Sequence, residues 1–104
     1  MDDFVVRGNL YELYGGLLNE NQRKVYEYHI IDDMSFTEIG EEMGTSRQAA
    51  QELFRRADKK LQDTEKTLGL QSKLTHIRER AIMILEQTND KTIQKLAGDI
   101  IDGV

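Results

Sequence analysis

Residues 35–60 constrain the fold more than any other part of the chain, because they predict two helices joined by a tight turn. Ser35 suits the N-cap of the first helix, and Glu38, three residues later, can accept a hydrogen bond from the backbone N–H of that cap. Gly44 follows, and glycine readily adopts the left-handed conformation that ends many helices. Gly40 is small enough to let another helix approach closely. The apolar residues of this first helix share one face: Phe36, Ile39 and Met43.

The second helix is predicted to start at Thr45 or Ser46, since Gln48 stands three residues after Thr45 and can complete another capping box. Its apolar residues recur at the spacing of a buried stripe: Ala50, Leu53, Phe54, Ala57 and Leu61. The same spacing turns a set of polar residues outward: Arg47, Gln48, Gln51, Glu52, Arg55, Arg56 and Lys59. Two helices joined by a short turn that contains glycine are typical of the helix-turn-helix unit.

The composition permits long helices and excludes several kinds of protein. The 104-residue chain contains no Pro and no Cys, so disulfides and cysteine-built zinc sites are excluded. A chain of this length suits one domain with an appended helical arm. Its acidic beginning shows no signal peptide, and no apolar run reaches the length of about 18 residues typical of a membrane span. We therefore expect a cytoplasmic protein that does not enter the membrane.

The charge is distributed unevenly along the chain, whose net charge is −5. Residues 1–44 hold three basic and ten acidic residues, a net of −7, whereas residues 45–104 hold eleven basic and nine acidic residues, a net of +2. Within residues 46–60, five basic residues stand against two acidic ones. An acidic protein attracts polyanions poorly through its overall field. The basic second helix therefore indicates a focused contact.

Two further helices are predicted before this pair. Residues 9–18 place Leu and Tyr on one stripe, although Gly15 and Gly16 each lower helix stability by about 1 kcal/mol relative to Ala. The two glycines favour close helix packing over a phosphate-binding loop, which would need a preceding strand. Asn19, with Gln22 three residues later, predicts the cap of a second helix whose apolar positions cover more than half of its circumference. We expect that helix to lie centrally in the bundle.

The C-terminal third predicts a long helix followed by a helical hairpin. The second helix of the pair can continue to Leu68, with Gly69 as its stop. Residues 72–88 predict the next helix, and Asn89 or Asp90 can cap a last one. The segment Ala-Ile-Met-Ile-Leu at residues 81–85 is apolar on every side and so needs partners on every side. The hairpin can pack on its copy in a second subunit, the leading interpretation, or extend the core of the monomer.

Catalysis finds no support in the spacing of reactive side chains. His29 and His76 are isolated, and no Ser or Thr stands in the context of a nucleophile elbow. A lone His is more often packed in the fold or exposed at the surface than bound to a metal. The adjacent acidic pairs at residues 32–33 and 41–42 point in different directions from a helix and suit solvent. We expect no enzyme, no metal and no cofactor.

The second helix of the pair has a physical mechanism for recognising double-stranded DNA. In a helix-turn-helix, the N-terminal part of the second helix enters the major groove while the first helix crosses the backbone. Arg47 can then donate to guanine O6 and N7, and Gln48 or Gln51 can pair with adenine N6 and N7. Residues further along the helix are better placed to contact phosphates. An ordinary solvated helix face is the alternative. The candidate DNA-binding residues are Thr45, Ser46, Arg47, Gln48, Gln51, Arg55, Arg56 and Lys59.

Several short segments between residues 9 and 50 occur in a distinctive order. They are Tyr-x-x-Leu-Leu, Asn-Gln-Arg at a helix start, a double-Asp turn, Ser-x-x-Glu-Ile and Ser-Arg-Gln-Ala. In combination they resemble the YlxM family of small bacterial helix-turn-helix proteins, and the unit is also similar to the promoter-reading fourth region of sigma factors. The resemblance implies an all-helical, often dimeric protein linked to the signal recognition particle pathway as a regulator. It places Ser46, Arg47 and Gln48 at the start of the reading helix.

The prediction is an all-α protein: a helical bundle with a helix-turn-helix, a long fourth helix and a C-terminal hairpin. Residues 1–69 form the helix-turn-helix domain, and residues 70–104 form a C-terminal extension that is a candidate dimerisation element. The leading hypothesis for function is a DNA-binding regulator acting as a homodimer. The alternative is an adaptor that binds signal recognition particle protein or RNA through the same helices. The sequence does not choose between these hypotheses.

Overall fold

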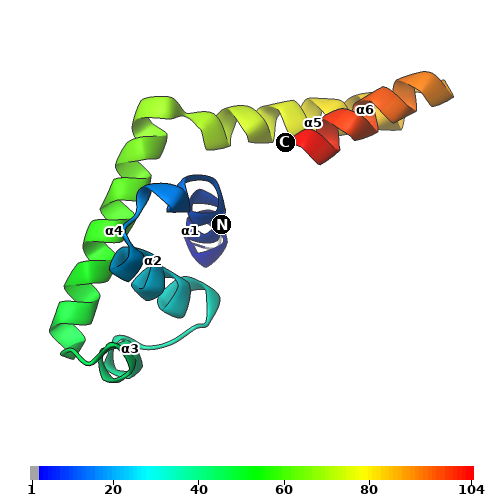
Figure 1. Cartoon of the computed structure of the whole chain (residues 1–104). Helices are drawn as coiled ribbons and strands as arrows, with labels where there is room; N and C mark the ends of the chain where they lie inside the picture. The colour runs from blue at the N-terminus through cyan, green and yellow to red at the C-terminus, as the bar shows by residue number, and fades with distance from the viewer. Residues whose placement is uncertain (1–2) are drawn as a thin grey trace. The chain divides into compact units, whose positions relative to one another are not determined.

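The computed structural model describes residues 3–104, which form helices and no strand (Figure 1). The α-helices are α1 (Asp3–Tyr14), α2 (Glu20–Tyr26), α3 (Phe36–Met43), α4 (Arg47–Leu68), α5 (Leu70–Gln87) and α6 (Lys91–Gly103). A 3₁₀ turn, η1 (Gly15–Leu17), follows α1, and a π-helical turn, η2 (Glu27–Ile31), continues α2. The predicted all-α fold, with its long fourth helix and its C-terminal hairpin, is confirmed. Among residues 3–104, none of the helices combines the length and the apolar character needed to cross a bilayer.

The described residues divide into two compact units, one that ends at Leu68 and one from Gly69 to Val104. The first unit contains α1 to α4, and the second contains α5 and α6. This division lies one residue from the boundary predicted at residues 69 and 70. That the two parts are separate domains stays a prediction.

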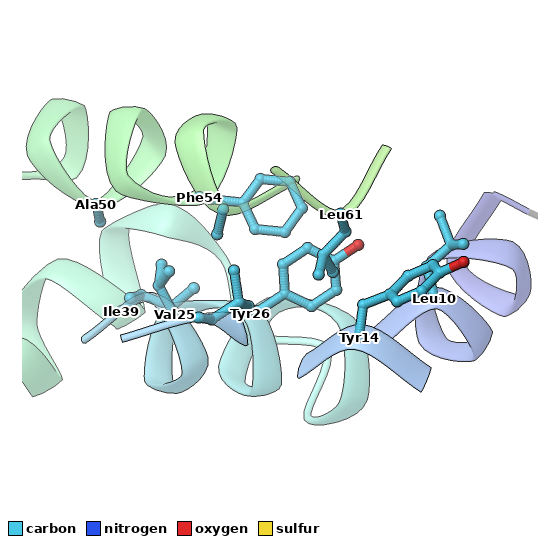
Figure 2. Close-up of a cluster of buried hydrophobic side chains, with 10 residues drawn as sticks. Leu10, Tyr14, Val25, Tyr26, Ile39, Ala50, Phe54 and Leu61 are labelled. Carbon is cyan, nitrogen blue, oxygen red and sulfur yellow. The ribbon is translucent and has the colours of Figure 1, made fainter. Parts of the chain in front are cut away.

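The core of the first unit draws side chains from every one of its helices (Figure 2). Val25 and Tyr26 of α2 are fully buried, so α2 is central, as predicted. The Tyr26 ring stacks on Tyr11 at 5.4 Å and on Phe54 at 5.0 Å between ring centroids. Fully burying one large apolar side chain stabilises a fold by about 1.5–3 kcal/mol. The buried cluster consists of Leu10, Tyr14, Leu18, Val25, Tyr26, Ile39, Ala50, Phe54, Ala57 and Leu61.

Two carboxylates of α4 attach this long helix to α1 and α2. Asp58 Oδ1 accepts hydrogen bonds from the Tyr26 hydroxyl at 2.9 Å and from Arg7 Nε at 3.0 Å. Two turns further on, Glu65 Oε1 accepts a hydrogen bond from the Tyr14 hydroxyl at 2.7 Å. Because α1, α2 and α3 all pack against α4, with α3 at its N-terminal end (Figure 1), these bonds help to position the outer face of α4.

The glycine pair ends a helix, which corrects the prediction of one helix across residues 9–18. α1 starts at Asp3 and stops at Tyr14, and Gly15 and Gly16 form η1. Gly15 is buried, and a Cβ on it would lie 2.9 Å from the Tyr11 ring. A Cβ on Gly16 would meet nothing within 4 Å, so Gly16 has no part in close helix packing. The low helix propensity of two consecutive glycines explains the early stop.

The second unit is the predicted hairpin, and it buries very little. Gly69 has a φ of 60° where α4 gives way to α5, and Asp90 caps α6 through the N–H groups of Thr92 and Ile93. Within this unit the fully buried side chains are those of two alanines, Ala81 and Ala97. Its exposed large apolar residues are Leu70, Ile77, Ile82, Met83, Ile84, Leu85, Ile93, Leu96 and Ile100.

Candidate nucleic-acid interface

The first helix of the helix-turn-helix begins and ends as predicted. Ser35 Oγ accepts a hydrogen bond from the Glu38 N–H at 3.1 Å, and Glu38 Oε1 accepts one from the Ser35 N–H at 3.0 Å. The pKa of Glu38 is lowered because the backbone N–H of Ser35, and then its hydroxyl, stabilise the carboxylate. At the other end Gly44 is left-handed, with a φ of 70°. Both ends of α3 are therefore set by local contacts.

Gly40 lets the backbone of the turn approach α3 closely. A Cβ at Gly40 would lie 2.8 Å from the Thr45 carbonyl oxygen and 3.0 Å from the carbonyl carbon of Ser46. The Thr45 N–H donates to the Gly40 carbonyl oxygen at 2.7 Å, which closes the turn. The predicted close approach is real, but the neighbour is the backbone that leads into α4 and not the body of another helix. Gly40 thus determines where α4 begins relative to α3.

The start of α4 differs from the prediction in one detail. Ser46 Oγ accepts a hydrogen bond from the Ala49 N–H at 3.0 Å, so Ser46 is the cap. Ala49 stands three residues after this cap and has no side chain that could return a bond. The predicted capping box between Thr45 and Gln48 is therefore absent, and the Gln48 side chain stays exposed.

The predicted contact residues surround the turn and the first half of α4, and every one of them is exposed. They are Thr45, Ser46, Arg47, Gln48, Gln51, Arg55, Arg56 and Lys59. On the other side of α4, Ala50, Phe54 and Ala57 are buried in the core. Leu53 packs on the same cluster that contains Ile39 of α3. The helix therefore holds its polar face outward as the spacing predicts.

The cations of this face differ in their partners. Arg55 donates to both oxygens of Glu52, from Nε at 2.9 Å and from Nη2 at 2.8 Å, and Arg56 Nε donates to Glu52 at 3.1 Å. Lys59 pairs with Asp63 at 2.5 Å. By contrast, no salt bridge within residues 3–104 engages Arg47. These counterions were not predicted from the sequence, although a Glu three and four residues before two Arg residues is a known stabilising pattern.

The cluster around Glu52 holds its carboxylate strongly in the charged form. The pKa of Glu52 falls to about 2, because hydrogen bonds from Arg55 and then from Arg56 stabilise the carboxylate. The same contact raises the pKa of Arg55. All three side chains remain at least 48% exposed. Exposed ion pairs of this kind add little to stability.

A hollow of about 470 Å³ adjoins this face, between α1, η2, α3 and α4. Its lining is formed by Arg7, His29, Phe36, Gln48, Gln51, Glu52, Phe54, Arg55 and Asp58. The His29 ring stacks on Phe36 at 4.3 Å and meets Phe54 edge-on at 4.7 Å. Its Nδ1 lies 2.9 Å from the Met34 carbonyl oxygen, which can accept a hydrogen bond from it. His29 is therefore a packed residue, and the described residues contain no cluster able to hold a metal ion.

Comparison with known proteins finds similarity along nearly the whole chain. The model of a family, UPF0122, described as "Putative helix-turn-helix protein, YlxM / p13 like", matches residues 2–100. A UPF0122 protein of Thermoanaerobacter sp. (strain X514) is 34% identical over 95% of this chain and 91% of its own length. A UPF0122 protein of Clostridium botulinum is 38% identical over 88% of this chain and 84% of its own length. One of Fusobacterium nucleatum is 30% identical over 97% and 98%. The similarity thus includes the C-terminal hairpin as well as the helix-turn-helix.

Proposed function

The chain belongs to the UPF0122 family of YlxM/p13-like helix-turn-helix proteins, and from this premise we propose that it is a regulatory protein that binds double-stranded DNA. One observation carries the proposal: α4 starts at a cap and a glycine turn, and it holds Arg47, Gln48 and Gln51 outward. These residue types, at the start of the second helix, are those that recognise base edges in the major groove.

The arrangement supports a division of labour along α4. In this proposal α3 crosses the DNA backbone and the first turns of α4 enter the major groove. Arg47 donates its two parallel N–H groups to a guanine, and Gln48 or Gln51 pairs with an adenine. Thr45 and Ser46 lie at the turn, close to the DNA backbone in this arrangement. Arg55, Arg56 and Lys59 follow later on the helix, where phosphates are nearest. Base contacts give specificity, and phosphate contacts give position.

We propose further that two copies of the chain act together as a homodimer joined through α5 and α6. Residues 69–104 hold five basic and five acidic residues, so two hairpins would not repel each other. Their large apolar side chains are 37–57% exposed, and self-association would cover them. A single small module covers roughly 600–1,000 Å² on DNA, and a dimer doubles that area.

The test is selection of bound fragments from random duplex DNA, followed by measurement of Arg47→Ala on the selected sequence. We expect the substitution to weaken binding to that sequence by about 5- to 150-fold, which corresponds to the roughly 1–3 kcal/mol of one bidentate base contact. Binding to random DNA should change far less, because phosphate contacts remain. An equal loss on both sequences would remove Arg47 from base recognition.

An adaptor that binds protein or RNA of the signal recognition particle is the second candidate. The net charge of −5 and the exposed apolar side chains of α5 and α6 favour it. Phosphate-driven DNA binding weakens with salt, with a slope near −0.9 per neutralised phosphate in a plot of log affinity against log salt. Docking on an apolar protein surface responds little to salt. The affinity of the chain can be measured for the selected duplex and for purified RNA and protein of the signal recognition particle. The affinities and their salt slopes then distinguish the two candidate functions.

A further inference from the structure

An acidic side chain stands in the centre of the basic face of α4. Glu52 follows Gln48 by one helical turn and precedes Arg55 and Arg56 by one turn, so it shares their face. Its side chain is 48% exposed and carries a full negative charge at neutral pH. A carboxylate in this place repels DNA phosphates, and nothing in base recognition by Arg47, Gln48 and Gln51 requires it.

We propose that Glu52 is a built-in counterion that occupies Arg55 and Arg56, suppresses their binding to phosphates, and so makes affinity depend on the base-reading residues. The inference rests on the proposed DNA-binding function. It assigns to Glu52 a role in limiting the sequence-independent affinity for DNA, although Glu52 itself touches no base.

The geometry shows how one carboxylate occupies two arginines. Glu52 meets Arg55 with two parallel N–H···O bonds, at 2.9 and 2.8 Å, which use the Nε and Nη2 atoms. A phosphate group binds an arginine best through that same pair of parallel donors. The Nε of Arg56 is bonded to the same carboxylate at 3.1 Å. A phosphate must therefore displace Glu52 before it gains the Nε and Nη2 pair of Arg55 or the Nε of Arg56.

The charges lead to the same conclusion. The two arginines and Glu52 together carry a net charge of +1, whereas the two arginines alone would carry +2. Exchange of a carboxylate for a phosphate replaces one charge-assisted bond by another, so the net gain is small. Random DNA, which has only phosphate contacts to offer, is bound weakly as a result. A preferred sequence adds base contacts to the same weakened phosphate contacts, so high affinity requires those base contacts.

The Lys59–Asp63 pair repeats the arrangement one turn further along, but more weakly. Lys59 makes one bond to Asp63, and an ammonium group has three donors, so two remain free for a phosphate. Removal of Asp63 should therefore matter less than removal of Glu52. Asp63→Asn, on the same helix, should therefore raise the affinity for random DNA less than Glu52→Gln does.

The experiment measures Glu52→Gln against the preferred duplex and a random duplex between about 50 and 200 mM salt. Freeing both arginines should raise affinity for random DNA by about 5-fold or more and steepen the salt slope by about 0.9 for each phosphate gained. Affinity for the preferred duplex should rise by a similar factor, because its phosphates meet the same two arginines. Glu12→Gln on α1 is the control, because it makes the same change of charge at an exposed site outside α4, α5 and α6.

A second measurement needs no DNA. The carboxyl carbon of Glu52, followed by NMR during an acid titration, should titrate well below 4.5, the usual pKa of a glutamic acid. Titration at 4.5 would mean that the arginines are free, and it would overturn the inference. Unchanged helical circular dichroism would show that the variants are folded.

The outcomes separate this inference from the proposed function. If the wild-type protein binds DNA and Glu52→Gln binds no better than Glu12→Gln, the counterion role is wrong. A loss of preferred binding in Glu52→Gln would instead make Glu52 a reader of cytosine N4, which a carboxylate can contact. If neither the wild type nor Glu52→Gln binds any duplex while Glu52 still titrates at low pH, the DNA-binding proposal fails. The ion pair then has only a structural role.

Discussion

Tyr26 shows how much of this fold depends on single side chains. Its ring is fully buried between Tyr11 and Phe54, and its hydroxyl donates to Asp58 of α4. The pKa of Tyr26 is raised, because burial and then the negative charge of Asp58 both disfavour the phenolate. The stability that this group contributes is therefore fully present below 10.0, the pKa of an unfolded tyrosine, and it is lost as the pH rises above that value.

We predict that the free energy of unfolding falls as the pH rises through about 10 and that Tyr26→Phe makes this fall shallower. At neutral pH the same variant should be less stable than the wild type by about 1–2 kcal/mol, since a hydrogen bond to a charged acceptor is lost while Arg7 still pairs with Asp58. Urea unfolding from about pH 7 to about pH 11 measures both effects.

Tyr28→Phe is the matched control, because Tyr28 is only partly buried. Within residues 3–104 its hydroxyl donates no hydrogen bond to a carboxylate, unlike that of Tyr26. It should leave the neutral-pH stability within about 0.5 kcal/mol of the wild type. Equal losses in the two variants would contradict the role given to the Tyr26 hydroxyl.

Contacts between residues close in the sequence could be predicted, whereas contacts between distant residues could not. The caps at Asn19 and Ser35 were predicted correctly, and Asp90 is one of the two residues predicted for the cap of α6, because each cap is formed with residues two or three positions away. The bond between Tyr26 and Asp58 spans 32 positions, and the ion pair between Arg7 and Asp58 spans 51. No local pattern indicates which polar groups so far apart will meet inside the fold.

At the level of elements, the turn between α3 and α4 was predictable and the end of α1 was not. Gly44 is a strong local signal for a left-handed turn, and it has the expected φ of 70°. Thr45 and Ser46 are both residues that can cap a helix, and the structure places the cap at Ser46. The stop at Tyr14 went unpredicted because the leucine and tyrosine stripe continues through the glycine pair to Leu18.

We predict that Gly40→Ala destabilises the protein by about 1–3 kcal/mol and weakens DNA binding. Its Cβ would lie 2.8 Å from the Thr45 carbonyl oxygen, so the backbone that leads into α4 must move. Gly8→Ala in α1 is the control, since a Cβ there meets nothing within 4 Å. Both sites are helical, so both variants gain helix propensity, by up to about 1 kcal/mol.

A comparison of the two changes in unfolding midpoint separates the contact at the turn from the gain in helix propensity. Thermal unfolding should show a lower midpoint for Gly40→Ala and an unchanged or higher midpoint for Gly8→Ala. A midpoint for Gly40→Ala at or above that of the wild type would show that the turn backbone can yield without cost. Gly40 would then not determine where α4 begins relative to α3.

At the level of the whole molecule, the two units bury very different amounts of apolar surface. The first unit has ten buried residues in one cluster, whereas in the second only Ala81 and Ala97 are buried. A two-helix hairpin with so small a core gains little hydrophobic stabilisation to offset the conformational entropy of folding. The sequence indicated this need for partners through the apolar run at residues 81–85, but no periodicity can identify the partner. The copy of the same hairpin in a second chain is our proposal.

The decisive variant for this assembly is Leu96→Glu. Leu96 of α6 is 57% exposed, and a charge within an apolar interface would be buried without a counterion. We expect the wild type to sediment as a dimer and Leu96→Glu as a monomer, with weaker DNA binding because each duplex then meets one module. Leu17→Glu is the control, since Leu17 lies in η1 of the first unit with a similar exposure of 53%. A monomeric wild type, or equal dissociation by both variants, would show that the apolar face of α5 and α6 serves another partner, and the adaptor function would then be the better account.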